Sequence, residues 1–347
     1  MRITCLLTTI LLFSAVGQAF AVPDCTAGNA TTLDGSENNL WTEDDNWNNG
    51  QPDKNKIACI PAGKTVVIDS VLGVPTDAEA DLIYIKSDTT NGAGKMTLEL
   101  DNTLTLFNHT DASQIDGELE VEYDGALMAD VPGAMDDVSI AGKGGVIEGV
   151  QFYTIPGFIK TRGSCQFGSN DGGTCTQASE CPLGICTMGT LTVECDASGD
   201  QSREECLVIT GALDITAKLV NNAYVVANQR IGTDPYIGPI FLTTHAKSGD
   251  GYWIAEHDTV PNPDTIGLLD VQIAVSGAAT WVVQGHQDVE LRLNAASTSL
   301  TGDVQVTNGT FLIRQNFETT GNLTMDDQGG PQIVVRQGKI AKFNVTP

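Results

Sequence analysis

The chain has 347 residues and a formal net charge of −26, with 44 acidic and 18 basic side chains. This charge excludes a general affinity for nucleic acid or for anionic membranes. Charged residues make up only 18% of the chain while glycine occurs 37 times, which is not the composition of a helical protein.

The first residues indicate a secretory leader. Arg2 precedes an apolar run over residues 3–16, and residues 19–21 (AFA) form a small-x-small cleavage motif. This order is typical of a signal peptide over residues 1–21, and the run is too short to span a membrane. No later stretch reaches transmembrane length, so we expect an exported protein, either secreted to the extracellular medium or held at the cell surface.

Residues 22–63 are expected to form an N-terminal cap. Trp41 and Trp47 lie in a stretch rich in Asn and Asp, which passes through Pro61 and Gly63 into the apolar strand KTVVID. Two tryptophans can form a lid over the first coil of a stacked β-structure, whose open edge would otherwise recruit other strands. An aromatic platform for sugar is the alternative, but the direct continuation into core-like residues favours the lid.

Short runs of alternating apolar and polar residues predict β-strands on both sides of a cysteine-rich segment. Each run is bounded by Gly, Asn or Asp, as turns between strands require. The clearest runs lie at residues 95–108, 117–128, 207–220 and 280–294. We therefore expect an all-β chain whose strand-forming parts span residues 64–163 and 207–347.

A weak internal repeat distinguishes between two all-β architectures. The pattern Thr/Asp-Gly-x-Leu/Val occurs at residues 116–121, 210–215, 301–306 and 320–325. Gly277, Gly302 and Gly321 follow one another at intervals of 25 and 19 residues. A spacing near twenty with glycine at a corner is typical of one coil of a β-solenoid, in which stacked coils share a core. The strands also fit an antiparallel β-sandwich, but the repeats favour a right-handed parallel β-helix.

Two motifs resemble those of a known group of proteins. The pattern W-x5-W-x-x-G-x-P, followed by I-P-A-G-x-x-V-x-x-D, resembles the start of secreted bacterial right-handed β-helix proteins. The TG-x-L repeats at 301–325 are similar to the passenger coils of such surface proteins. The resemblance implies an extracellular β-solenoid with a structural or adhesive role. Its motifs are structural, so they imply no catalytic residue.

An even number of cysteines remains after removal of the leader, which in an exported protein predicts disulfides. They are Cys25, Cys59, Cys165, Cys175, Cys181, Cys186, Cys195 and Cys206. Residues 164–206 hold six of them without a clear strand or helix pattern, so we expect a disulfide-rich insert that projects from the solenoid. The segment resembles small cysteine-rich inserts of myxobacterial surface proteins. A metal site is disfavoured there, because the segment has neither a C-x-x-C pair nor a histidine.

The remaining two cysteines flank the tryptophan lid. A bond between Cys25 and Cys59 would close the cap and would contribute about 3–4 kcal/mol through the loop entropy of the unfolded chain.

Alternating acidic residues in the segment GELEVEYDG predict a cation site. Glu118, Glu120 and Glu122 share one face of a strand, and Glu99 and Asp101 alternate in the same way in the preceding strand. If these strands stack, like charges would lie about 5 Å apart, which is unfavourable without a cation such as calcium. A solvated acidic face screened by salt is the alternative. No other cofactor is indicated.

The densest polar cluster lies at residues 244–258. It contains Lys247, Asp250, Glu256, His257 and Asp258. A polysaccharide lyase on a β-helix would use such a base and such carboxylates, although a charged loop between strands has the same composition. The sequence has no hydrolase or zinc-protease motif. It therefore favours a non-catalytic structural or adhesive module, with a polysaccharide lyase, a glycoside hydrolase or a carbohydrate-binding module as alternatives.

The expected partners are polysaccharides or other cell-surface components, and a second copy of the chain. Residues 34–53 hold six acidic side chains and no basic one, whereas residues 331–347 hold Arg336, Lys339 and Lys342 and no acidic one. Opposite charges at the two ends of a solenoid would favour head-to-tail association. Lysines that protect a terminal edge against strand addition are the alternative.

Overall fold

The structure is a computed structural model that describes residues 21–35, 38–70, 74–122, 124–150, 155–195, 202–229, 239–257, 267–326 and 330–344. The predicted signal peptide therefore lies outside the described residues except for Ala21, as does Asp258 of the polar cluster. The helices that the structure describes are single 3₁₀ turns at Asp44–Asn46, Ala178–Glu180 and Arg203–Glu205. None of them could cross a bilayer.

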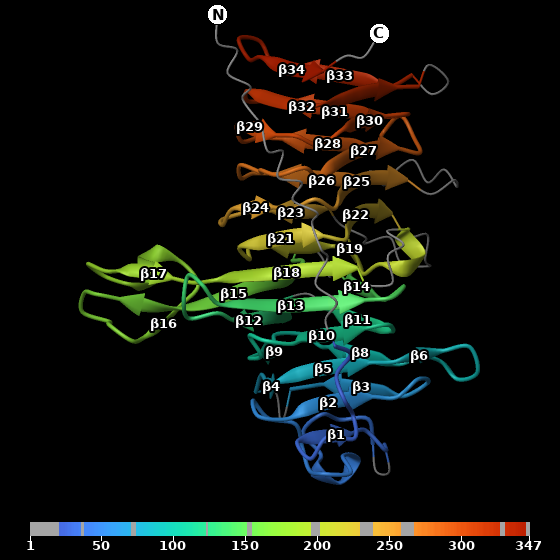
Figure 1. The fold of residues 1–347 in the computed structure, drawn as a ribbon, viewed down its shortest axis with the longest axis vertical. Coiled ribbons are helices and arrows are strands. Elements are labelled where there is room, and N and C mark those ends of the chain that lie inside the picture. The colour runs from blue at the N-terminus through green and yellow to red at the C-terminus, as the bar shows by residue number, and fades with distance from the viewer. Residues whose placement is uncertain are drawn as a thin grey trace, which may run out of the picture.

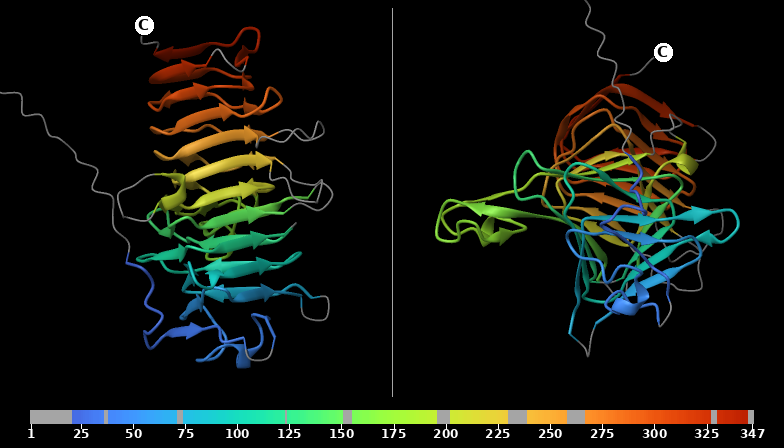
Figure 2. Two further views of the ribbon diagram at one scale, coloured as in Figure 1. Left: turned by 90° about the vertical axis from the view of Figure 1, so that its right-hand side faces the viewer. Right: turned by 60° about the horizontal axis from the view of Figure 1, so that its bottom comes forward.

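Parallel strands stack into a column of coils with three faces, which we call sheets 1, 2 and 3 (Figures 1 and 2). Sheet 1 contains β1 (Ala30–Thr32), β2 (Ile57–Ile60), β5 (Leu82–Ile85), β10 (Ala112–Ile115), β13 (Asp137–Gly142), β18 (Thr190–Cys195), β21 (Leu219–Asn222) and β24 (Lys247–Ser248). Sheet 2 contains β3 (Thr65–Ile68), β8 (Lys95–Leu98), β11 (Glu118–Val121), β14 (Val146–Gly149), β19 (Val208–Gly211), β22 (Tyr224–Gln229), β25 (Tyr252–His257), β27 (Thr280–Gln284), β30 (Val304–Val306), β32 (Phe317–Met325), β29 (Ser297–Leu300) and β34 (Ala341–Asn344). Sheet 3 contains β4 (Asp77–Ala80), β9 (Thr103–Leu106), β12 (Ala126–Asp130), β15 (Gly157–Gln166), β20 (Leu213–Ile215), β23 (Ile240–Leu242), β26 (Leu268–Val271), β28 (Glu290–Leu293), β31 (Thr310–Ile313) and β33 (Gln332–Val335), and β16 (Thr174–Cys175) and β17 (Ile185–Thr187) pair with β15.

The core consists of columns of inward-facing side chains, because parallel pairing in register places equivalent residues of successive coils above one another. One column of sheet 2 runs through Val66, Met96, Leu119, Ile147, Ile209, Val225, Trp253, Trp281 and Val304. Each of these side chains is at most 1% exposed. Since burial of apolar surface contributes about 25 cal/mol per Å², such columns are the main source of stability.

These ladders confirm the predicted all-β parallel β-helix and exclude the antiparallel sandwich. Among the named strands of the described residues, antiparallel pairing is confined to β15 with β16 and β17, and to the hairpin of β6 (Ser87–Asp88) and β7 (Gly92–Ala93). The run expected at 95–108 is two strands, β8 and β9. The chain turns between them at Asp101, whose φ is 63°.

Trp41 and Trp47 cover the first coil, as the sequence predicted. Both side chains are buried, and their rings meet edge to face with centroids 5.1 Å apart. The backbone N–H of Trp41 donates to the carbonyl oxygen of Val67 at 2.8 Å, so the lid continues sheet 2 beyond β3. Regular strands begin before the KTVVID segment, because β1 and β2 inside the expected cap already belong to sheet 1. The Cys25–Cys59 disulfide ties the start of the cap to β2.

The glycine repeat marks corners of the coils, but its copies are not equivalent. A Cβ atom at Gly321 would lie 2.0 Å from the carbonyl oxygen of Gly302, so only glycine allows the coils to approach so closely. In the preceding coil the residue against Gly302 is Ala279 rather than Gly277. Gly211 lies at a different corner, where β19 ends before β20. The repeat therefore predicted stacked coils but not their register.

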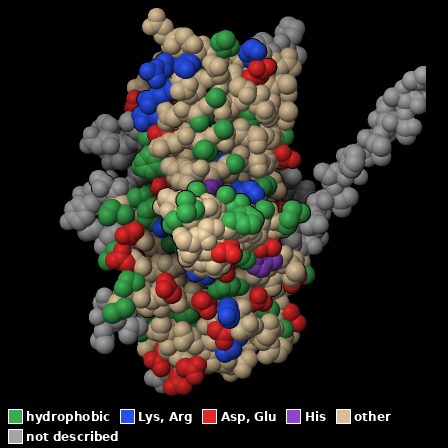
Figure 3. Space-filling view, turned by 90° about the vertical axis from the view of Figure 1, so that its left-hand side faces the viewer, with side chains coloured by type: hydrophobic (Ala, Val, Ile, Leu, Met, Phe, Trp, Pro, Cys, Tyr) green, Lys and Arg blue, Asp and Glu red, His purple; other side chains and the backbone are tan. Residues whose placement is uncertain are grey.

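A knob of residues 163–188 projects sideways from β15, and Figure 3 views it end-on (Figures 1 and 3). Four disulfides join the eight expected cysteines: Cys25–Cys59, Cys165–Cys181, Cys175–Cys186 and Cys195–Cys206. Two of them lie in the knob. The expected insert 164–206 is not free of regular structure, because it includes β18, a strand of sheet 1. The Cys195–Cys206 bond therefore closes a separate loop beside the column.

Candidate functional site

A pocket of about 580 Å³ lies on the outer face of sheet 2, where β11, β14 and β19 meet the turn Arg203–Glu205. This volume falls in the range of about 300–1,000 Å³ that is typical of small-ligand sites. The described residues that line it include Glu118, Val146, Glu148, Arg203, Glu204, Val208 and Thr210.

The floor of the pocket results from the register of three strands. Glu118, Val146 and Val208 are partners across β11, β14 and β19, and Glu148 pairs with Thr210 two positions further along. Alternate residues of a strand face the same side, so both rows point away from the core. The floor is thus apolar at the two valines and polar around them.

The turn Arg203–Glu205 forms one wall and is fixed at two points. The Cys195–Cys206 disulfide joins the end of β18 to the residue that follows the turn. The Arg203 guanidinium donates to the Glu256 carboxylate of β25 at 2.6 Å. A covalent bond and a charged hydrogen bond therefore hold the wall against the sheet.

The lining of the pocket is acidic. Glu118, Glu148 and Glu204 accompany one arginine, which is already paired with Glu256. Among the described lining residues there is no serine, cysteine, histidine or lysine, so they include no nucleophile and base of the triad type. Carboxylates, a guanidinium and a hydroxyl around an apolar floor can hold a polar ligand by hydrogen bonds.

The five carboxylates predicted to hold calcium fall into two groups. Glu118 and Glu120 belong to β11, where Glu118 lines the pocket and Glu120 accepts a hydrogen bond from Lys95 Nζ at 2.8 Å. The other three lie at the turns that follow β8 and β11: Glu99, Asp101 and Glu122. The expectation that Glu99 and Asp101 alternate along a strand is therefore wrong, because β8 ends at Leu98.

Like charges of successive coils do approach one another at this corner. Burial, together with the neighbouring Asp69, raises the pKa of Glu99 to about 7, and Glu122 adds to the effect. A hydrogen bond to Asp124 raises the pKa of Asp101. Within the described residues no three carboxylates bring their oxygens within 4.8 Å of one another. Calcium binding here stays a prediction.

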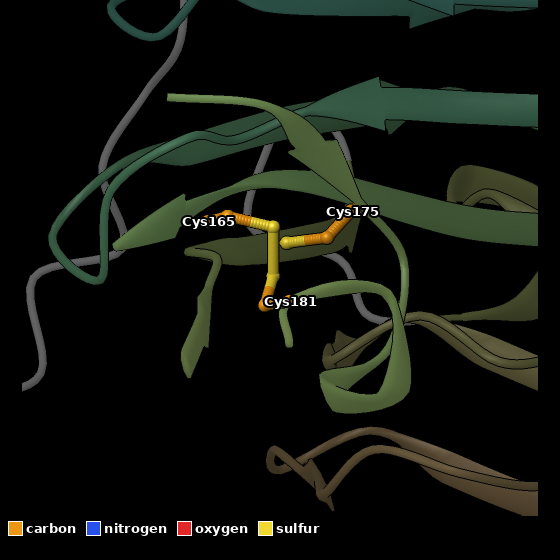
Figure 4. A group of neighbouring side chains, drawn as sticks. All are labelled: Cys165, Cys175 and Cys181. Carbon is orange, nitrogen blue, oxygen red and sulfur yellow. A yellow bond between two sulfur atoms is a disulfide. The ribbon is translucent and has the colours of Figure 1, made fainter. Parts of the chain in front are cut away.

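Three cysteine sulfurs form the one group of potential metal ligands that comes together in the described part of the chain (Figure 4). Cys165 is bonded to Cys181, and Cys175 is bonded to Cys186. Sulfur in a disulfide is not the thiolate that binds zinc. The predicted disulfides are therefore confirmed in the knob.

A charged loop would expose Lys247 to solvent, but the structure buries this side chain. It is fully buried in a core column of sheet 1, between Leu219 and Val275. Its ammonium group donates to the carbonyl oxygens of Thr243 at 2.8 Å and of His245 at 2.5 Å. Burial lowers the pKa of Lys247 to about 7. This lysine holds a turn together from inside the core.

The other members of the polar cluster are dispersed. Glu256 pairs with Arg203 beside the pocket, and the His257 ring lies 5.3 Å from that of His286. The backbone N–H of Asp250 donates to the side chain of Asn222 in the preceding coil. The loop expected over this cluster is partly strand, since β25 spans Tyr252–His257.

Sequence reasoning missed the pocket. Arg203 and Glu204 lay inside the expected cysteine-rich insert, and Val146 and Glu148 belong to no motif. The available signal was the short spacing between Cys195 and Cys206, which encloses a loop. Only the pairing of β14 with β11 brings these residues to Glu118.

Comparisons of the chain with protein-family models, with curated proteins and with solved structures find no match.

Proposed function

We propose that the protein is an exported, non-catalytic module with a structural or adhesive role at a cell surface. The observation that carries this proposal is the unbroken core column from Val66 to Val304, which makes the stack of coils a rigid support. Four disulfides support an oxidising compartment outside the cytoplasm. The resemblance of the cap motif to bacterial β-helix surface proteins supports the same setting.

The support displays two features that suit recognition. The disulfide-held knob projects from one side of the stack (Figure 2), and the pocket opens on the outer face of sheet 2. Projecting loops on a rigid scaffold are common places for binding.

A second candidate function is binding or cleavage of a polysaccharide in the pocket. The observation that favours it is the set of three glutamates around an apolar floor, because paired carboxylates are the groups that glycosidases use. Lys247, the residue expected to act as the base of a lyase, is buried in the core and is not among the residues that line the pocket.

The test combines localisation with an activity screen. Antibodies against the full chain should label intact, unpermeabilised producing cells, and the purified protein should release neither unsaturated products nor reducing ends from a panel of acidic and neutral polysaccharides. Label that appears only after permeabilisation contradicts the surface role. The second candidate would be established instead if Glu148→Gln abolished product formation while Asp77→Asn, at the exposed first residue of β4, left it intact.

Head-to-tail association of two copies belongs to the same proposal. Basic side chains gather near the C-terminal coils and acidic ones near the first coils (Figure 3), and Arg336, Lys339 and Lys342 account for the basic charge of residues 331–347. Light scattering should show assembly that weakens with added salt and with Lys339→Glu plus Lys342→Glu. A monomer at low salt and high concentration contradicts it.

A further inference from the structure

Three large apolar side chains are exposed at the outer end of the knob. Phe167 is 70% exposed, Leu183 is 95% exposed and Ile185 is 55% exposed. They form one patch, because Ile185 pairs with Gln166 across β15 and β17, and a Cβ atom at Gly184 would lie only 2.1 Å from the carbonyl oxygen of Phe167. Figure 3 shows hydrophobic side chains gathered on this end. We call these three residues the knob tip.

The backbone of the knob tip disfavours the residues that occupy it. Phe167 has a φ of 63° and Leu183 a φ of 61°. This left-handed conformation suits glycine and asparagine and is a genuine outlier for bulky side chains. Solvent also disfavours large apolar side chains at these positions. Neither local folding nor solubility explains why Phe167 and Leu183 occupy these positions. A contact between the knob tip and a binding partner explains them.

The three residues of the knob tip carry no charge, although the protein is strongly acidic. The knob contains two charged side chains, Asp171 and Glu180. Asp171 accepts a hydrogen bond from the backbone N–H of Phe167 at 2.8 Å, and Glu180 accepts from the backbone N–H and the hydroxyl of Thr176 at 2.6 and 2.9 Å. Both carboxylates therefore accept hydrogen bonds within the knob, which orients them toward its backbone, and two disulfides make the knob rigid.

The size of the patch decides between two kinds of partner. Three such side chains expose on the order of 300 Å² of apolar surface, whereas a stable protein–protein interface needs about 800 Å² from each partner. A lipid bilayer needs no complementary shape and accepts a few apolar side chains at its interface, where a neighbouring carboxylate can stay in water. The small, apolar, projecting tip fits a bilayer better than it fits a protein.

We propose that the knob tip inserts Phe167, Leu183 and Ile185 into the interface of a neutral lipid bilayer. The proposal deepens the adhesive role proposed above by naming a surface that the module contacts. Its test uses purified protein and vesicles, so it fails or succeeds independently of where cells place the protein.

The experiment measures co-sedimentation of the full chain with phosphatidylcholine vesicles. The wild type should bind, and Phe167→Asn plus Leu183→Asn should lower the partition coefficient at least tenfold, since two apolar side chains leave the bilayer. The variant should keep its melting temperature, because asparagine suits the left-handed backbone at both positions. Val74→Ser removes an apolar side chain that is 65% exposed elsewhere on the column, and it should leave binding unchanged.

A tryptophan placed at the tip gives a second readout. Fluorescence of the Phe167→Trp variant should shift to shorter wavelength with vesicles and should be quenched by brominated lipid. Binding should also persist in high salt, because no charge drives it. A wild type that does not sediment with vesicles overturns the proposal, as does a double variant that binds equally well. A lipid-independent dimer that the double variant lacks would assign the tip to a protein contact instead.

Discussion

In the coil stack one large hydrophobic cluster draws aliphatic, aromatic and methionine side chains from successive coils. In the knob the buried cluster consists of Cys165, Cys175 and Cys181, with Cys186 packed against them. A coil buries its apolar face against its neighbours, so it needs no covalent link. The knob is too small to build such a core and depends on its disulfides. The coil stack and the knob should therefore unfold independently of each other.

The largest effect is expected in the core column. Trp253 is fully buried and stacks on Trp281 with ring centroids 6.1 Å apart. Trp253→Ala should lower the free energy of unfolding by about 3–5 kcal/mol, measured by urea denaturation, because the rigid column cannot collapse into the cavity. Gln305→Ala on the exposed side of β30 is the control and should change it by less than about 0.5 kcal/mol. Equal effects of both variants would contradict the column as the source of stability.

Lys247 is a fully buried charged side chain beside these apolar columns, and its effect on the free energy of unfolding depends on pH. Its folded pKa of about 7 lies below the unfolded value of 10.5, so folding opposes the charged form. The resulting penalty is absent above about pH 10.5 and grows as the pH falls to about 7. The free energy of unfolding of Lys247→Met, relative to that of the wild type, should therefore rise by about 4 kcal/mol as the pH falls from 10.5 to 7.

The measurement for Lys247 is the difference in unfolding free energy between variant and wild type across this pH range. Using the difference cancels the titration of all other groups. The exposed Lys54→Met serves as the control and should show no such pH dependence. A constant difference for Lys247→Met would mean that this lysine is solvated.

Breaking a knob disulfide should affect the knob alone. Cys175→Ser with Cys186→Ser opens a loop with a sequence separation of 11, which in the loop-entropy model removes about 3 kcal/mol of local stability. Limited proteolysis should then cut within residues 163–188 while the melting temperature of the column stays within about 1 °C. Cys25→Ser with Cys59→Ser is the comparison, because it opens the cap and should lower that melting temperature. Unfolding of the whole chain by the knob variant would show that the regions are coupled.

A smaller effect is expected at the acidic corner. The folded pKa of Glu99, about 7, lies above its ordinary value of 4.5, so this carboxyl favours folding when protonated and loses that contribution as the pH rises from 4.5 to 7. Glu99→Gln should therefore stabilise the protein above pH 7 by about 1 kcal/mol, after allowance for solvent screening, and should have little effect at pH 4. Asp77→Asn, on the exposed start of β4, should show no such dependence in thermal melts.

Calcium is expected to act at the same corner with the smallest effect. If a cation screens Glu99 and Glu122, millimolar calcium should raise the melting temperature by about 2 °C at pH 8, and Glu99→Gln should reduce this rise. A melting temperature that neither calcium nor a chelator changes would leave the corner as a solvated acidic face.

Much of the fold could be predicted from local pattern. The alternation of apolar and polar residues predicted the strands, and the glycine spacing predicted the coils. The two tryptophans before the first apolar run predicted the lid. Each of these features depends on residues close in sequence. The candidate site could not be predicted in this way. Its wall comes from Arg203 and its floor from Val146 and Val208, which share no motif and meet only through the pairing of β11, β14 and β19.

The sequence by itself determined that this chain is all-β, and it favoured stacked parallel coils and paired cysteines, since periodicity, glycine corners and an even cysteine count are local or compositional properties. Only the tertiary structure decided which residues meet. Coils of unequal length shift the register, so Ala279 rather than Gly277 lies against Gly302, and a lysine expected in a loop enters the core at Lys247. Register between coils is set by packing across the whole column, and no single segment encodes it.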